Sequence, residues 1–321
     1  MKKHLLRLAF INGLLFLSIC IFAQEYSDFY FTRVNGENGL SESNVKAILQ
    51  DSYGFMWFGT KNGLNRYDGT SILQFDCDDL EEGTGNHNIG ALFEDKERNL
   101  WVGTDRGVYI YNPAVDVFKR FKIASSEGIT LDNWVAEILS DSLDNIWVLI
   151  PDQGLFRYKD GKVHHYSLID KDNLKNNNPE CICINEQGEV WVGTSGIGLF
   201  KYNYRDDNFE QYLTDRMGRS LIDKTIISIC FQKENAILGI HEGDLLKYNT
   251  RTDELSEVSF LGEKKTFLRD VMCFGDEIWV GSLHGIFIIN EKENNVIHLK
   301  EGLMRSFSLS DNSIYSIYKD Y

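Results

Sequence analysis

Apolar and polar positions follow one another along the chain in a pattern that predicts short β-strands joined by tight turns. Residues 45–50 form a β-rich run with apolar side chains on both faces, which indicates a strand that is buried on both sides. The turn Asp51-Ser52-Tyr53-Gly54 comes next, and three further strands are expected before residue 76. Residues 44–75 therefore predict one unit of four antiparallel strands.

This unit recurs along the chain. Its second strand carries a phrase such as Trp57-Phe58-Gly59-Thr60, and tryptophan opens that phrase again at residues 101, 147, 191 and 279. Ile237 fills the remaining slot, so that successive slots lie 44, 46, 44, 46 and 42 residues apart. A period of about 40–50 residues with four strands in each copy is typical of β-propeller blades. The predicted fold class is all-β, and an open β-solenoid or a sandwich is the alternative.

The N-terminus is expected to stand apart from this array. Lys2, Lys3 and Arg7 precede an apolar run that ends at Ala23, which is the pattern of a secretory signal peptide over residues 1–23. A retained membrane anchor is the alternative. The β-propeller sensor domain is expected at 24–321, with repeats starting near residues 44, 88, 134, 178, 225, 268 and 313.

The last of these repeats is incomplete. Residues 309–320 match the start of the first repeat, and residues 29–34 look like a lone fourth strand. We therefore expect six full repeats plus the first strand of a seventh, and we interpret the sequence as the front portion of a longer protein.

Net charge bears on the class of binding partner, and the cysteine content bears on possible disulfides. The net charge is −15, so the chain is not expected to bind nucleic acid, which would need a basic face. Five cysteines follow the predicted signal peptide. They are interpreted as small buried hydrophobic residues, although an exported protein permits disulfides that the sequence cannot assign. These five are Cys77, Cys181, Cys183, Cys230 and Cys273.

One stretch of the first repeat points to a family. Residues 39–69 contain Gly39-Leu40-Ser41, the turn at Asp51 and the run Asn62-Gly63-Leu64-Asn65-Arg66-Tyr67-Asp68-Gly69. This sequence motif resembles the two-component regulator propeller repeats of hybrid two-component sensors. The resemblance implies a periplasmic sensor region that recognises oligosaccharides released from glycans. It also implies a parent protein that is anchored in the inner membrane, forms a homodimer and carries a histidine kinase outside these 321 residues.

Candidate ligand-binding residues lie in two sets of loops that are expected to share one face of the ring. Trp134 is the only tryptophan of the mature chain outside the repeat slot, and it could either stack on a sugar ring or pack between loops. The repeated aspartates, such as Asp51, are interpreted as turn formers. No metal or cofactor is expected. The candidates are Trp134, Asn133, Lys61, Asn62, Asp105, Arg106, His241 and His284.

The sequence thus predicts an exported ligand-sensing propeller without chemistry of its own. The first alternative is a propeller that serves as a scaffold for protein–protein interaction. The second is a propeller enzyme, such as a lyase or glycosidase, which would need acidic and basic groups that converge on one point.

Overall fold

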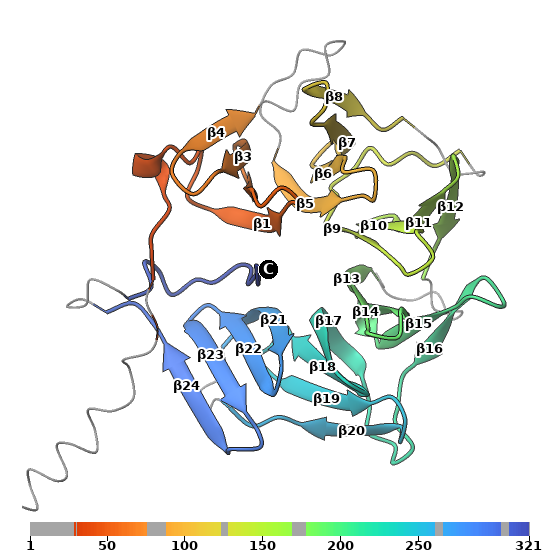
Figure 1. Cartoon of the computed structure of the whole chain (residues 1–321). Coiled ribbons are helices and arrows are strands. Elements are labelled where there is room, and N and C mark those ends of the chain that lie inside the picture. Colours follow the sequence, from red (N-terminus) through yellow and green to blue (C-terminus); the bar gives the residue numbers. More distant parts are fainter. Residues whose placement is uncertain are drawn as a thin grey trace, which may run out of the picture.

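The computed structural model describes residues 29, 31–75, 88–122, 128–168, 178–260, 266–302 and 308–320. Within them, six antiparallel blades of four strands each surround a central axis (Figure 1). A short 3₁₀ helix, η1 (Gly36–Asn38), precedes the first blade. The prediction of an all-β propeller is confirmed. The expected signal peptide at 1–23 lies outside the described residues.

The strands follow the predicted order in every blade. Blade 1 holds β1 (Val45–Gln50), β2 (Met56–Thr60), β3 (Gly63–Tyr67) and β4 (Ile72–Phe75). Blade 2 holds β5 (Ile89–Glu94), β6 (Leu100–Thr104), β7 (Gly107–Asn112) and β8 (Val117–Arg120). Blade 3 holds β9 (Glu137–Ser140), β10 (Ile146–Ile150), β11 (Gly154–Lys159) and β12 (Lys162–Tyr166).

The second half of the ring repeats this order. Blade 4 holds β13 (Pro179–Ile184), β14 (Val190–Ile197), β15 (Leu199–Asn203) and β16 (Asn208–Tyr212). Blade 5 holds β17 (Ile222–Gln232), β18 (Asn235–Ile240), β19 (Leu245–Asn249) and β20 (Glu254–Glu257). Blade 6 holds β21 (Leu268–Phe274), β22 (Glu277–Ser282), β23 (Gly285–Asn290) and β24 (Asn295–Leu299). Blades 4 and 5 are also joined directly, because the extended β14 and β17 pair with each other.

The core lies between neighbouring blades, where the repeated slot packs most tightly. Trp57, Trp147 and Trp191 are at most 1% exposed. The glycine that follows two residues later lets the next blade approach closely. A Cβ atom on Gly59 would lie 2.6 Å from Ile89 of blade 2. Burial of these large side chains is the dominant favourable term in folding, and the repeat explains why it recurs around the ring.

The turn between the first and second strands ties down the tryptophan. Asp51 accepts backbone hydrogen bonds from Tyr53 and Phe55 through Oδ1, and its Oδ2 accepts the indole N–H of Trp57 at 2.7 Å. Blades 2 and 3 repeat this contact with Asp95 to Trp101 at 2.8 Å and Asp141 to Trp147 at 2.9 Å. The aspartates are turn formers, as predicted, and they also satisfy a buried indole donor. We call this contact the Asp–Trp contact.

The prediction that residues 309–320 form the first strand of a seventh repeat is wrong in one respect. Residues 308–320 lie where it should be: the N–H of Ile314 donates to Ser282 at 2.9 Å, as Val135 donates to Thr104 in an earlier copy. A Cβ atom on Gly281 would lie 2.9 Å from Ile314. Nevertheless, no strand forms among the described residues of this segment or of 29–34. A β-ladder needs a paired neighbour, and among the described residues no second strand of that blade lies beside the segment.

The cysteines divide into two kinds. Cys181 is buried and Cys183 is half-buried, and both are free thiols, as the interpretation of small hydrophobic residues expected. Cys230 and Cys273 depart from that interpretation, because they form a disulfide between β17 of blade 5 and β21 of blade 6. Cys77 lies outside the described residues. The disulfide joins residues that are 43 positions apart, so it links two blades covalently.

Candidate functional site

The two sets of predicted loops do share one face of the ring. Backbone hydrogen bonds join the loop between the second and third strands to the loop that leads into the first strand. They run from Asp105 to Asn88 at 3.1 Å, from Ser195 to Asn178 at 2.9 Å, and from His241 to Thr225 at 2.9 Å. We call this side the loop face. The opposite side, where the turns such as Asp51–Phe55 lie, is the turn face.

Trp134 lies on the loop face just before β9 and is half-buried. Its ring packs on Gly90, where a Cβ atom would lie 2.6 Å from the indole. The ammonium of Lys46 lies 4.8 Å from the ring centroid, within the range of a cation–π interaction. Trp134 therefore reaches back from blade 3 over Gly90 of β5 in blade 2 to Lys46 of β1 in blade 1.

The other candidates on blades 1 to 3 sit at exposed loop positions. Lys61, Asn62, Asp105, Arg106 and Asn133 are all exposed. The carbonyl of Arg106 accepts a hydrogen bond from Arg120 at 3.1 Å, and Arg120 also forms an ion pair with Asp132 at 3.1 Å. This pair fixes the loop beside Asn133 and Trp134.

The two candidate histidines form a separate group on blades 5 and 6. The ring of His241 lies 5.1 Å from that of Phe267, which is 50% exposed. His284 Nδ1 lies 2.6 Å from the hydroxyl of Thr266. The structure thus brings the histidines close to a shared loop, but it does not bring them together with Trp134. The candidates make two groups on one face and no single cluster.

Sequence reasoning missed two carboxylates that surround the axis. The residue after the bulge in each first strand is small in four blades, namely Ala47, Ala91, Cys181 and Ser228. Glu137 and Asp270 hold this position in blades 3 and 6. A comparison of the repeats could have found them, because a carboxylate replaces a small residue there.

Both carboxylates have raised pKa values because they are buried. Burial raises the pKa of Glu137 to about 8 against a hydrogen bond from the N–H of Ile182 at 2.7 Å, and the charge of Asp270 adds to the rise. Burial also raises the pKa of Asp270, which accepts the N–H of Ile317 at 2.8 Å and the hydroxyl of Ser228 at 2.9 Å. These bonds give each carboxylate a structural role: Asp270 holds the C-terminal segment near the axis.

The part of the chain that the structure describes contains no group of three or more His, Cys, Asp or Glu side chains placed to hold a metal ion. It also contains no helix that is long and apolar enough to cross a membrane.

Comparisons with known proteins agree on the repeat. The two-component regulator propeller family matches residues 39–62 and 83–106. A histidine kinase named P4 from Formosa agariphila is 46% identical over 54 residues, which are 17% of this chain and 4% of that protein. This chain therefore spans only a small part of the curated relative that it matches.

Solved structures share the fold. The extracellular domain of a proposed one-component system from B. thetaiotaomicron has a TM-score of 0.73 at 22% identity, over 92% of this chain and 38% of that one. The extracellular domain of a proposed hybrid two-component system from the same organism has a TM-score of 0.72 at 24% identity, over 91% and 39%. PorZ of Porphyromonas gingivalis, a surface component of a secretion system, reaches 0.65 at 16% identity, over 89% and 45%. The predicted resemblance is confirmed over residues 39–62 and 83–106, which match two-component regulator propeller repeats, and the chain as a whole shares the propeller fold of these structures.

Proposed function

We propose that this propeller is the ligand-sensing part of a hybrid two-component sensor, that it works in the periplasm, and that it recognises oligosaccharides from polysaccharide breakdown. The observation that carries the proposal is the placement of Trp134 on the loop face. A half-buried indole offers a flat apolar surface on which a sugar ring can stack, and Lys46 beside it and Asn133 next to it in sequence offer hydrogen-bond donors for hydroxyl groups.

The signal is proposed to pass to a histidine kinase outside these 321 residues. A ligand shifts an equilibrium between two arrangements only if it binds one of them more tightly. In a homodimer of the parent protein, a glycan bound on the loop face would favour one packing of the extracytoplasmic domains. The histidine kinase relative and the extracellular domains of similar fold support this placement.

Calorimetry of the protein with a panel of oligosaccharides tests the proposal. Trp134→Ala should weaken binding at least tenfold, which corresponds to about 1.4 kcal/mol. Tyr53→Ala is the matched control, because Tyr53 is an aromatic residue on the turn face that is 57% exposed.

Three outcomes would count against the glycan. Equal loss in both variants would remove Trp134 from the site. Folded protein that binds no oligosaccharide but retains a periplasmic protein would favour the interaction scaffold. Turnover of any polysaccharide in the panel would favour the propeller enzyme.

A further inference from the structure

A basic side chain lies beside the slot tryptophan in three blades. It stands on the third strand, directly opposite the tryptophan of the second strand in the β-ladder. The distances from charged group to ring centroid are 5.7 Å for Arg66 and Trp57, 5.8 Å for Arg157 and Trp147, and 5.3 Å for Lys201 and Trp191. These distances fall within the cation–π range of about 6 Å. In blades 1, 3 and 4 a cation therefore lies beside the slot tryptophan.

Acidic side chains balance these cations. Arg157 of blade 3 forms an ion pair with Asp207 of blade 4 at 3.0 Å, and Lys247 of blade 5 forms one with Glu291 of blade 6 at 2.7 Å. Lys201 pairs with Glu189 of its own blade at 2.6 Å. In blades 3, 4 and 5 the cation on the third strand is thus paired with a carboxylate.

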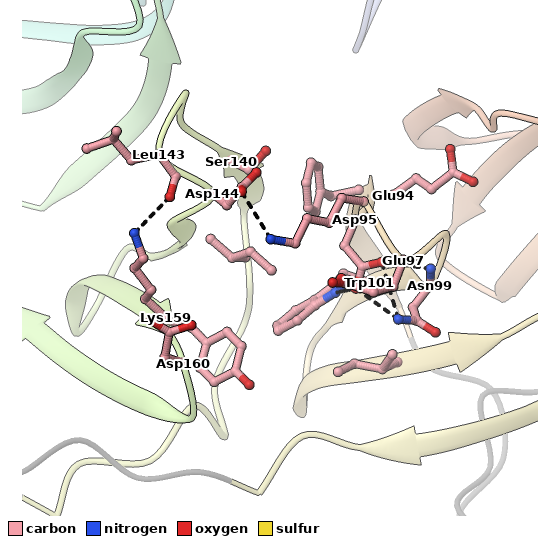
Figure 2. A pocket seen from close by; sticks show the side chains of 15 residues that line it. Glu94, Asp95, Glu97, Asn99, Trp101, Ser140, Leu143, Asp144, Lys159 and Asp160 are labelled. Carbon is pink, nitrogen blue, oxygen red and sulfur yellow. Dashed lines mark hydrogen bonds and ion pairs between the residues drawn. The ribbon is translucent and has the colours of Figure 1, made fainter.

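Blades 2 and 6 depart from this arrangement, and in blade 6 Ile288 stands opposite Trp279. Ile110 stands opposite Trp101, so the groove towards blade 3 has an apolar wall but no cation from this position. A cavity of about 500 Å³ opens there (Figure 2). That volume falls within the range of about 300–1,000 Å³ for small-molecule sites. We call this cavity the blade 2–3 groove; its lining includes Phe93, Trp101, Ile110, Tyr158, Glu97 and Asp160.

Tyr158 in this groove lacks the aspartate that accepts the hydroxyl of the equivalent tyrosine in blades 2 and 5. The tyrosine hydroxyls of Tyr111 and Tyr248 donate to Asp116 and Asp253, five residues further on, at 2.8 and 2.9 Å. The hairpin after Tyr158 is shorter, and the fifth residue is Val163. The groove therefore offers a phenol that lacks this carboxylate.

The two lysines that line the groove do not replace the missing cation. Lys96 bridges to Asp144 at 3.0 Å, and both side chains are more than 60% exposed, so the pair lies at the solvent-exposed edge of the groove. Lys159 donates to the carbonyl of Leu143 at 2.9 Å. Five carboxylates line the groove together with these two lysines. The surplus of negative charge favours a positively charged occupant.

We propose that the blade 2–3 groove binds a small organic cation with a guanidinium or primary ammonium group. The charged group takes the place that Arg66, Arg157 and Lys201 occupy in the other grooves. It lies beside the rings of Trp101 and Tyr158, with the carboxylates of Asp160 and Glu97 as counter-charges. The groove is on the turn face, so this site is separate from the glycan site proposed for the loop face.

Calorimetric titration of the protein with argininamide tests the site, and citrullinamide, in which a neutral urea replaces the guanidinium, is the reference. Both compounds are used as their Nα-acetyl derivatives, so that neither carries an α-ammonium group. Argininamide should bind and citrullinamide should not. Ile110→Arg supplies the missing cation from the chain itself, as Arg66 and Arg157 do, and should abolish binding of argininamide. Val115→Arg is the matched control, because it adds the same charge to blade 2 at a residue that is 64% exposed and does not line the groove.

A double substitution keeps the test decisive if Ile110→Arg disturbs folding. Glu97→Gln with Asp160→Asn removes two charges from exposed turn residues and should weaken binding at least tenfold. The proposal is overturned if argininamide and citrullinamide bind equally, if neither binds, or if folded Ile110→Arg binds argininamide as the native protein does.

Discussion

The turn face and the loop face of the ring follow different rules. On the turn face the same contacts return from blade to blade: the Asp–Trp contact in blades 1 to 3 and a basic side chain beside the tryptophan in blades 1, 3 and 4. On the loop face one side-chain contact also returns, from the hydroxyl that ends the second strand to the carbonyl of the glycine in the next loop, but the candidate ligand-binding residues differ from blade to blade. The difference teaches that positions which repeat hold the fold, whereas candidate functions gather where the repeat is broken.

Loss of the disulfide should have the largest effect, and it tests whether the turn face depends on its repeated contacts alone. Blade 5 has Ile237 in the tryptophan slot and is joined to blade 6 by Cys230–Cys273. Closing a loop of this length restricts the unfolded chain, so replacing both cysteines by alanine should cost about 4 kcal/mol. Thermal unfolding measures the loss.

A reductant provides the control for this prediction. It should lower the melting temperature of the native protein to that of the double variant and leave the variant unchanged. A variant as stable as the native protein would mean that strand packing alone holds blades 5 and 6 together.

Asp141→Asn should have the next largest effect. Asp141 is 4% exposed and accepts hydrogen bonds from Trp147 at 2.9 Å and Tyr204 at 2.8 Å. An amide that replaces this carboxylate leaves a buried donor unpaired, which should cost about 3 kcal/mol in denaturant unfolding. Asp144→Asn in the same turn is the control, because its ion pair with Lys96 is exposed and is worth less than about 1 kcal/mol.

The Asp141 effect should depend on pH. Burial opposes ionisation of Asp141, but the hydrogen bonds from Trp147 and Asn145 outweigh it and lower its pKa below the ordinary 3.8. A carboxylate with a lowered pKa stabilises the fold above its unfolded pKa and loses that contribution as the pH falls through the folded value. The difference between Asp141→Asn and the native protein should therefore shrink below pH 3.8, and a constant difference would contradict the assignment.

Gly90→Ala tests the packing of Trp134 on the loop face, for comparison with the contacts of the turn face. A new Cβ atom would lie 2.4 Å from the carbonyl of Val135 and 2.6 Å from the ring of Trp134, so both must move. Overpacking of this kind costs about 1–3 kcal/mol, and the displaced indole should also lose affinity for any glycan that it binds. Gly36→Ala is the matched control, since its Cβ would meet no atom within 4 Å.

Per pH unit, the smallest effect is expected from Glu137→Gln near the axis. Its pKa is raised from 4.5 to about 8, so the folded protein holds a proton that the unfolded chain releases between these values. Native stability should therefore fall as pH rises from 4.5 to 8, by less than about 1.4 kcal/mol for each pH unit. Glu137→Gln should remove this slope in unfolding experiments at several pH values, and an unchanged slope would assign it to Asp270 or another group.

Much of the fold could be predicted from the sequence, because the blade is a local unit. The turn at Asp51 and the tryptophan slot lie within a few residues of one another, so a short stretch of sequence is enough to predict their contact. The disulfide could not be predicted in this way. Cys230 occupies the position in its repeat that Leu49 holds in the first repeat, whereas Cys273 lies one residue further along its strand. Only the packing of blade 5 against blade 6 brings the two cysteines together.

The candidate sites divide along the same line. The sequence placed the loop residues on one face, but the contacts of Trp134 with Gly90 and Lys46 span three blades and depend on how the blades stack. The blade 2–3 groove did leave a signal, because Ile110 replaces a basic residue that four other blades have. That signal has no meaning until the structure shows that the basic residue stands beside a tryptophan.

The Asp–Trp contact has a consequence for how such rings change over time. Because each turn is closed within its own blade, a copy can be duplicated with its stabilising contact complete and needs no matching change elsewhere. The loops on the far side take no part in that contact. They are therefore free to vary in length and chemistry, so that a lineage can acquire new specificities while the scaffold that presents them stays the same.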